Sequence, residues 1–320
     1  MDRSIVEAAG VPFYGIPSGK LRRYLSLRNF IDLFKILAGF FKARNILKKE
    51  KPDLLFSKGG FVSVPPCMAA KSLKIPVFSH ESDFSPGLAT KLNMRVSETI
   101  FTAYGETIQM LPGEYRDRAV AVGNPVRKEF RSADAQKGLA FLGITNNLPV
   151  VLVLGGSQGA LEINTLIRGS LDELTRHFNV VHQTGANDAE TVSGNSRYFP
   201  YQYIKNEMPD VLAAADIVVG RSGAGTVWES AGLGKPMVLI PLAGSGTRGD
   251  QVENARIFEK GGAALVLGPD DRSPSKLAET IISLWNDQDR YTSMKKASAS
   301  MGAKDGAGLI SKYIERRFQN

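Results

Sequence analysis

Residues 151–164, VLVLGGSQGALEIN, read as a buried strand, a glycine turn and the start of a helix. The first four residues are apolar, as expected for a strand in the middle of a parallel sheet. Gly155 and Gly156 let the backbone turn tightly. Such a turn aims amide groups and a helix dipole at whatever lies above it, which favours an anion. The loop lacks the Gly-Lys-Ser/Thr of a P-loop and the complete G-x-G-x-x-G fingerprint. It therefore indicates either a phosphate site or only a tight connection.

Short apolar runs like this one alternate with helical patterns along the whole chain. The expected strands are residues 54–57, 77–80, 99–102, 119–122, 150–154, 179–182, 198–201, 217–220, 237–240 and 264–267. This alternation predicts parallel sheets with helices on both faces. The sequence GNPVRK at 123–128, followed by a polar stretch, is the natural break. We expect two Rossmann-like, doubly wound α/β domains that face a cleft: residues 1–125 and 126–305, with a last helix at 306–320 that returns to the first domain.

Composition excludes several classes of protein. Hydrophobic residues make up 43% and charged residues 22% of the chain, which excludes a disordered or fibrous protein. The single cysteine, Cys67, excludes an internal disulfide framework and is typical of a reducing cytoplasm. We expect no membrane-spanning helix, because no run of about 18 apolar residues occurs. The residues after Met1 do not resemble a signal peptide.

Residues 20–51 carry the net charge of the chain. Ten Lys or Arg and two acidic residues give this segment +8, and the whole chain is also +8. Phe30, Phe34, Leu37 and Phe41 recur within it at helical spacing, which predicts an amphipathic helix. Its aromatic face could touch lipid while Lys and Arg meet an anionic membrane surface. Alternatively, it is a core helix with a solvated basic face. We expect no nucleic acid partner, because no recognised nucleic-acid module surrounds the patch.

Glycine-rich and polar loops follow several expected strands at their carboxyl ends, where a parallel sheet presents its ligand. They are KGGFVSVPP after Ser57, HESDFSPG after Ser79, GRSGAGTVWE after Val219 and PLAGSGTRGDQVENA after Ile240. Arg221 can offset the charge of a diphosphate. Structural interpretations remain open for Thr226-x-x-Glu229, for His80 with Glu81, and for Gln251 with Asn254. Thr226-x-x-Glu229 could be a capping box. His80 and Glu81 could be a satisfied pair at a strand end. Gln251 and Asn254 could form an exposed polar helix face.

Seven motifs occur in the order SKGGFVSVP, HESDFSPG, GNPVRKE, GGSQGALEIN, HQTG, GRSGAGTVWE and DQVENA. In order and spacing the sequence closely resembles the bacterial peptidoglycan glycosyltransferases of family 28, the undecaprenyldiphospho-muramoylpentapeptide β-N-acetylglucosaminyltransferases. The resemblance covers nearly the whole chain and implies the GT-B type of fold. It implies UDP-N-acetylglucosamine as the donor and an undecaprenyl-linked muramoyl-pentapeptide as the acceptor. The implied location is the cytoplasmic face of the cell membrane, as a peripheral protein.

The resemblance also assigns roles to residues. The implied donor-binding residues are Arg127, Ser157, Gln158, Ile204, Arg221, Ala224, Thr226, Glu229, Gln251 and Asn254. The implied acceptor-binding residues are Gly59, Gly60, Phe61 and Asp83. Ser157 is placed on the diphosphate, the backbone of Ile204 against uracil, and Glu229 on the ribose. Gln251 and Asn254 are placed against the sugar.

The implied reaction is attack by an acceptor hydroxyl on the anomeric carbon as UDP departs, which inverts that centre. Such a site needs a base on one side and groups that stabilise the diphosphate charge on the other. Helix amides with Arg221 or Arg127 can stabilise this charge, so we expect neither a metal nor another cofactor. The D-x-D at 287–289 is expected to cap a helix. His80 or Glu81 is the candidate base.

Members of the family begin with a strand and a GGTGGH-like loop, whereas MDRSIVEAAG resembles the stretch after their second strand. We therefore expect an N-terminal domain without its first strand and loop. The chain should then bind the UDP-sugar through its C-terminal half but transfer the sugar slowly. Two other functions stay open at this point. One is a related UDP-sugar transferase with another lipid acceptor, such as diacylglycerol. The other is a truncated, non-catalytic nucleotide-sugar binder.

Overall fold

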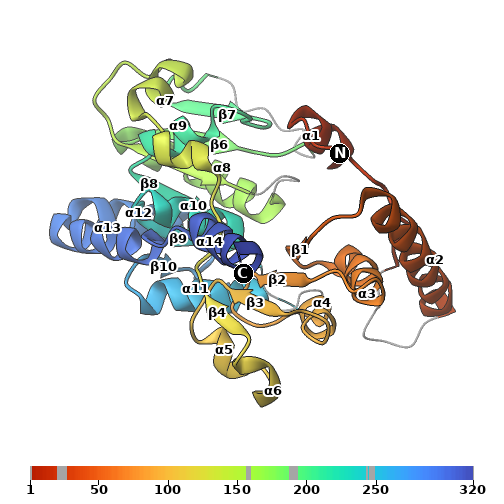
Figure 1. The fold of residues 1–320 in the computed structure, drawn as a ribbon. Helices are drawn as coiled ribbons and strands as arrows, with labels where there is room; N and C mark the ends of the chain where they lie inside the picture. Colours follow the sequence, from red (N-terminus) through yellow and green to blue (C-terminus); the bar gives the residue numbers. More distant parts are fainter. Residues whose placement is uncertain are drawn as a thin grey trace. The chain divides into compact units, whose positions relative to one another are not determined.

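The computed structural model describes residues 2–19, 27–155, 160–186, 194–242, 244 and 249–319. The chain divides into two compact units, Met1–Val122 and Gly123–Asn320. Each unit contains one parallel sheet with helices packed on it (Figure 1). The predicted α/β class is confirmed, and every expected strand is present within one residue of its expected bounds. The predicted domain limits and the return of the last helix to the first domain stay predictions.

The first unit is built on a four-stranded sheet with the order β1-β2-β3-β4 among the described strands. Its elements are α1 (Asp2–Ala8), α2 (Leu27–Glu50), β1 (Leu55–Ser57), η1 (Phe61–Ser63), α3 (Val64–Ser72), β2 (Val77–Glu81), α4 (Leu88–Asn93), β3 (Thr99–Thr102), α5 (Thr107–Met110), α6 (Gly113–Arg116) and β4 (Ala119–Ala121). Ser57 of β1 pairs with Ser79 of β2 in parallel register. The loops that follow these two strands therefore start at the same edge of the sheet.

The long helix α2 packs on α3, and small residues line its buried side. Gly39 and Ala43 are buried, and a Cβ added to Gly39 would collide with the backbone carbonyl of Pro17. The aromatic face points elsewhere: Phe34 is 69% exposed and Phe41 is 63% exposed. These two side chains are therefore not part of the core, contrary to the core-helix interpretation of the segment. The side chain of Phe30 lies outside the described residues.

The described residues of the second unit form a six-stranded sheet with the order β10-β9-β8-β5-β6-β7. Its elements are η2 (Lys128–Ser132), α7 (Ala135–Leu142), β5 (Val150–Leu154), α8 (Leu161–His177), β6 (Asn179–Gln183), β7 (Tyr198–Tyr201), α9 (Met208–Ala214), β8 (Ile217–Gly220), α10 (Ala224–Gly232), β9 (Met237–Leu239), α11 (Asp250–Lys260), β10 (Ala264–Val266), η3 (Pro269–Asp271), α12 (Pro274–Asn286), α13 (Gln288–Gly302) and α14 (Gly306–Gln319). The chain order reverses between β5 and β8, which is the switch point where doubly wound sheets bind ligands.

The strand of the opening motif, β5, lies in the middle of this sheet, and all five of its residues are buried. Val151 and Val153 pack into a core cluster with Ile163 of α8 and Leu277 of α12. Because side chains alternate along a strand, the intervening Leu152 faces the opposite side of the sheet. Burial on both faces explains why this strand is a continuous apolar run rather than an alternating one.

Candidate active site

Helix α10 begins at the switch point, directly after the loop that follows β8. Its first residue is Ala224, its N-cap is Gly223, and no side chain caps it. The first-turn amides are therefore available to an anion in front of the helix. Thr226 lies inside the first turn and not at the N-cap, so the capping-box interpretation of Thr226-x-x-Glu229 is wrong. The predicted roles of Ala224 and Thr226 at a diphosphate stay predictions.

Arg127 and Glu229, 102 positions apart in the sequence, meet in the second unit. Nε of Arg127 donates to Oε1 of Glu229 over 3.3 Å, and the guanidinium lies 4.7 Å from the centre of the Phe130 ring. Burial raises the pKa of the Glu229 carboxyl, and the charge of Arg127 opposes this rise. The structure therefore brings together two of the predicted donor residues.

Arg221 forms an ion pair that the sequence did not reveal. Its Nη1 lies 2.8 Å from Oε2 of Glu162 in the first turn of α8, and it also donates to the carbonyl of Ile240. Arg272 donates to the other oxygen of Glu162 over 2.9 Å. Burial alone would raise the pKa of Glu162, but the hydrogen bonds from Arg272 and Arg221 lower it on balance. Arg221 thus links the loop after β8 to the helix after the glycine turn, and its contact with a diphosphate stays a prediction.

Helix α11 holds the same loop from another side. The side-chain amide of Asn254 donates to the carbonyl of Ser222 over 3.1 Å, and the Ser222 hydroxyl donates to the carbonyl of Gln251 over 2.6 Å. Oε1 of Gln251 accepts from the amide of Leu242. Asn254 is fully buried, so the exposed-surface interpretation is wrong for this residue. The predicted sugar contacts of Gln251 and Asn254 stay predictions.

The remaining predicted donor residues are only partly described. The amide of Ile204, expected near uracil, donates to Oε1 of Gln183 at the end of β6 over 2.9 Å. Tyr203 beside it is 47% exposed, so an aromatic surface is available at this position. Ser157 and Gln158 lie outside the described residues.

In the first unit, the loop after β1 carries the predicted acceptor residues. Gly59 and Gly60 have φ angles of 82° and 77°, in the left-handed region that side chains other than glycine rarely adopt. The amide of Gly59 donates to Oγ of Ser57, and Phe61 directly after the turn is 44% exposed. The turn therefore presents backbone and an aromatic ring at the carboxyl end of β1.

The candidate bases lie at the end of β2 beside that turn. Glu81 is 7% exposed, and its Oε1 accepts from the amide of Asp83. Its Oε2 accepts from the amide of Gly87 and from the hydroxyl of Thr90 over 2.5 Å. The carboxylate thus shapes the loop that follows β2, in accord with a structural role at the strand end. His80 is 1% exposed, with Nδ1 3.1 Å from Nζ of Lys58. Catalysis by either residue stays a prediction.

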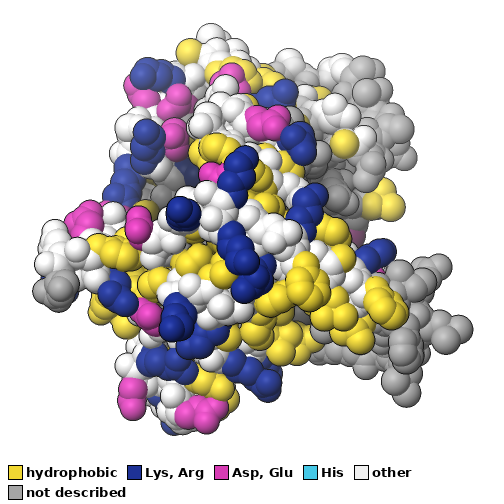
Figure 2. All heavy atoms as spheres, turned by 45° about the vertical axis from the view of Figure 1, so that its right-hand side comes forward, with side chains coloured by type: hydrophobic (Ala, Val, Ile, Leu, Met, Phe, Trp, Pro, Cys, Tyr) yellow, Lys and Arg dark blue, Asp and Glu magenta, His cyan; other side chains and the backbone are white. Residues whose placement is uncertain are grey.

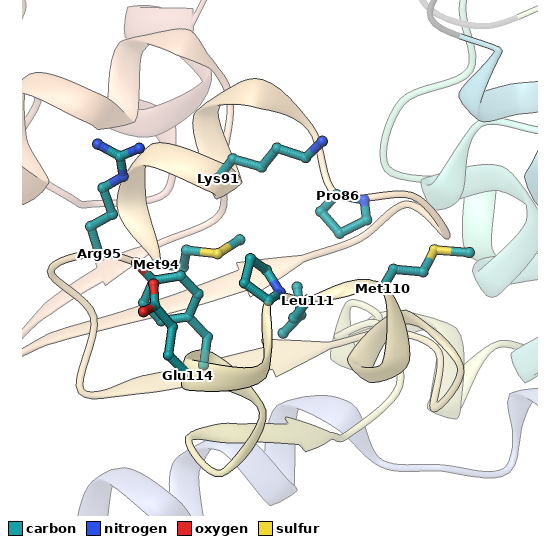
Figure 3. Close-up of a pocket in the computed structure, with 9 residues that line it drawn as sticks. Pro86, Lys91, Met94, Arg95, Met110, Leu111 and Glu114 are labelled. Carbon is teal, nitrogen blue, oxygen red and sulfur yellow. The ribbon is translucent and has the colours of Figure 1, made fainter.

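A pocket of about 330 Å³ lies in the same unit among α4, α5 and α6 (Figure 3). Met94 and Leu111 form its apolar floor, and each is 1% exposed. Lys91, Arg95 and Glu114 stand around it. Pro86, at the end of the HESDFSPG loop, connects the pocket to that loop, but none of the predicted catalytic or acceptor residues lines it.

Comparison with known families follows the division into two units. The N-terminal domain of glycosyltransferase family 28 matches residues 1–102, and the C-terminal domain of this family matches residues 150–310. The chain belongs to glycosyltransferase family 28. Two parallel-sheet units with these two domains correspond to the GT-B fold, as the sequence predicted.

Relatives with names support this membership. A Treponema denticola protein named UDP-N-acetylglucosamine--N-acetylmuramyl-(pentapeptide) pyrophosphoryl-undecaprenol N-acetylglucosamine transferase is 46% identical over 99% of this chain and 88% of its own length. The crystal structure of Acinetobacter baumannii MurG has a TM-score of 0.71, 23% identity, and covers 99% of this chain and 88% of its own. The UDP-GlcNAc 2-epimerase of Neisseria meningitidis, solved with UDP-GlcNAc, has a TM-score of 0.63, 16% identity, and covers 92% and 84%. Because transferase and epimerase both share this architecture, the structural likeness shows the fold, whereas the family match separates the two activities.

Several residues of the second and first units hold the predicted site residues in place and were not predicted from the sequence. Glu162 and Arg272 support Arg221, Ser222 links α11 to the loop after β8, and Lys58 contacts His80. Glu162 alone had a local signal, as an acidic residue in the first turn of the helix that follows the glycine loop. The others became visible only through contacts between distant segments.

Proposed function

We propose that this chain transfers N-acetylglucosamine from UDP-N-acetylglucosamine to an undecaprenyl-diphosphate-linked muramoyl-pentapeptide, in the synthesis of peptidoglycan. The observation that carries the proposal is the 46% identity, over 99% of the chain, to a transferase of that name. The acceptor hydroxyl attacks the anomeric carbon as UDP departs, and this displacement inverts the centre.

The second unit holds the donor in this proposal. The uncapped N-terminus of α10 faces the diphosphate, and Glu229 accepts hydrogen bonds from the ribose hydroxyls. Burial raises the pKa of the partly buried Glu229 carboxyl, and the charge of Arg127 favours its ionised form. Asn254 and Gln251 hold the loop before α10 in place through Ser222. As UDP leaves, the first-turn amides of α10, with Arg127 or Arg221, stabilise the negative charge that grows on the diphosphate.

The first unit holds the acceptor and meets the membrane in this proposal. The exposed face of α2 is defined here as Leu33, Phe34, Leu37 and Phe41. The last turn of this helix carries the basic residues Lys48 and Lys49. Apolar side chains beside cations fit the interface of an anionic bilayer. Figure 2 shows hydrophobic side chains at the surface next to Lys and Arg side chains. Among the helices that the structure describes, none is both long enough and apolar enough to cross a bilayer. We place the protein at the cytoplasmic face, as a peripheral protein.

A transfer assay with sugar-labelled UDP-N-acetylglucosamine tests the proposed reaction. The chain is incubated with three separate acceptors: a short-chain lipid-linked muramoyl-pentapeptide, diacylglycerol, and no lipid. We expect labelled disaccharide on the muramoyl lipid only, with the β configuration that inversion of the donor requires. Label on diacylglycerol, or conversion of the donor to its 2-epimer without any acceptor, would contradict the proposal and favour one of the related activities.

A further inference from the structure

The ammonium of Lys58 lies between groups from two neighbouring strand ends. Its Nζ is 3.1 Å from Nδ1 of His80 and donates to Oγ of Ser82 over 2.8 Å. Oγ of Ser82 is in turn 3.3 Å from the same Nδ1. Lys58 directly follows β1 and directly precedes the turn at Gly59 and Gly60. The cluster therefore stands at the carboxyl edge of the sheet, where parallel sheets bind ligands.

The chemistry of the cluster fixes which partner donates. A protonated lysine has three donors and no acceptor, so the ring nitrogen that faces it must accept. His80 is then neutral, with its proton on Nε2. His80 is 1% exposed, whereas Lys58 is an exposed residue. The lysine, and not the histidine, is therefore the member of the cluster that a ligand at the surface can reach.

Desolvation strengthens the attraction of the Lys58 ammonium for an anion, while the nearby carboxylates of Glu81 and Asp83 oppose it. Lys58 as a residue is exposed, but protein atoms surround much of its ammonium. This desolvation lowers the pKa of Lys58 to about 8, and the charges of Glu81 and Asp83 oppose the shift. A partly desolvated cation gains most from a multiply charged partner. The adjacent glycines leave the backbone open to close approach, as in other anion-binding turns.

We propose that Lys58 binds the diphosphate of the lipid-linked acceptor, and that His80 and Ser82 are positioning residues that orient its ammonium beside the Gly59-Gly60 turn. The inference rests on the proposed function and names a residue for its acceptor side. In this role, Nδ1 of His80 accepts from the ammonium of Lys58. While Lys58 is charged, that nitrogen therefore does not abstract a proton from the acceptor.

This assignment predicts a pH dependence with a defined sign. Only the ammonium form of Lys58 attracts a diphosphate, so the affinity is complete below its pKa of about 8 and falls as the pH rises through that value. Within the part of the chain that the structure describes, the titratable groups shown to act on Lys58 are His80 and Glu81 on β2 and Asp83 in the following loop. An exchange of lysine for arginine keeps the positive charge throughout this range and so separates the contribution of Lys58 from theirs.

The experiment measures binding of farnesyl diphosphate to the full chain by calorimetry, with UDP present at saturation so that the donor's own diphosphate site is filled. We expect Lys58→Met to weaken farnesyl diphosphate binding about tenfold at neutral pH, as the loss of a charged hydrogen bond implies. Lys58→Arg should stay within about threefold of the wild type and lose the decline above pH 8. UDP affinity, measured separately, should be unchanged in both variants.

A matched control is Lys71→Met, which removes an exposed lysine of α3 in the same unit and should bind farnesyl diphosphate like the wild type. Nitrogen NMR of the histidine rings reports the cluster directly. His80 should carry its proton on Nε2 in the wild type and in Lys58→Arg, and a mixture of tautomers in Lys58→Met. The chain has only three histidines, so its ring signals can be assigned by single variants.

The proposal is overturned if the wild type does not bind farnesyl diphosphate, if Lys58→Met binds it normally, or if His80 carries its proton on Nδ1. Normal UDP binding in the same experiment would leave the donor side of the proposed function intact. A loss of UDP binding by the wild type would instead count against the proposed function itself.

Discussion

Glu229 shows how one side chain can be prepared for a ligand by its surroundings. Burial disfavours its charged form, while Arg127, at 3.3 Å, favours it. Glu229 is partly buried beside the start of α10, where a polar ligand would supply further hydrogen bonds to its carboxylate. Glu229 is therefore suited to a ribose contact, whereas the position of Thr226 inside the first turn excludes the helix-capping alternative.

Replacing Glu229 by alanine should weaken UDP binding by about 1 to 3 kcal/mol, because the ribose hydroxyls lose charge-assisted hydrogen bonds. The wild-type affinity should fall as the pH is lowered through the raised pKa of Glu229, since only the carboxylate accepts with both oxygens. Glu229→Gln should show weak binding with little pH dependence. Calorimetry with UDP at neutral and mildly acidic pH measures all three.

The control for this series is Glu259→Gln, at an exposed position of α11 in the same unit. It should bind UDP like the wild type at each pH. An unchanged affinity in Glu229→Ala would show that Glu229 serves the packing of α10 and Arg127 only.

At the scale of one element, α2 has two unlike faces. Gly39 and Ala43 allow the helix to lie close to the rest of the first unit, while the exposed face of α2 gains nothing from that packing. An apolar surface of this kind usually marks an interaction site. The basic excess of the surrounding segment selects an anionic partner.

Changing Phe34 and Phe41 together to serine should reduce co-sedimentation with anionic phospholipid vesicles at least tenfold, because both rings are exposed and available to insert. The free energy of unfolding should change little, for the same reason. Wild-type binding should also fall with added salt, since head-group attraction is screened within about 10 Å at 0.1 M.

Leu161→Ser provides a comparison, because Leu161 is 74% exposed on α8 in the other unit and should not affect vesicle binding. Equal binding of the wild type to neutral and anionic vesicles would refute the electrostatic part of the interpretation. If the Phe34, Phe41 double variant bound anionic vesicles as well as the wild type does, the insertion part would be refuted.

At the scale of the whole molecule, each unit has its own sheet and its own buried clusters. The large cluster of the second unit joins β5, β6, β8 and β9 to α8 and α12. Arg131 at the start of this unit pairs with Asp305 just before α14, so the two ends of the unit are connected. All described residues with predicted donor roles belong to it.

The fragment 123–320 should therefore fold by itself and bind UDP within about twofold of the full chain, because its core and its described donor residues are complete. Circular dichroism and calorimetry test the two parts of this prediction. A fragment that unfolds cooperatively but does not bind UDP at millimolar concentration would mean that the first unit contributes to the donor site.

Local patterns were sufficient for the strands, the fold class and one cap. Buried parallel strands are short apolar runs, and each strand expected from such a run is present in the structure. Asp287 of the D-x-D pattern caps α13 by accepting from the amide of Arg290, as predicted. These features depend on residues that are neighbours in the chain.

The sequence by itself thus determined which segments are strands, which loops begin at the ligand edge of a sheet, and to which family the chain is similar. Only the tertiary structure decided that Glu162 joins Arg221 to Arg272. The same holds for the burial of Asn254 against the loop of Ser222 and for the contact between Lys58 and His80. Glu162 and Arg272 are 110 positions apart. Such contacts depend on the order in which strands assemble into a sheet, and a local pattern of residues carries no record of that order.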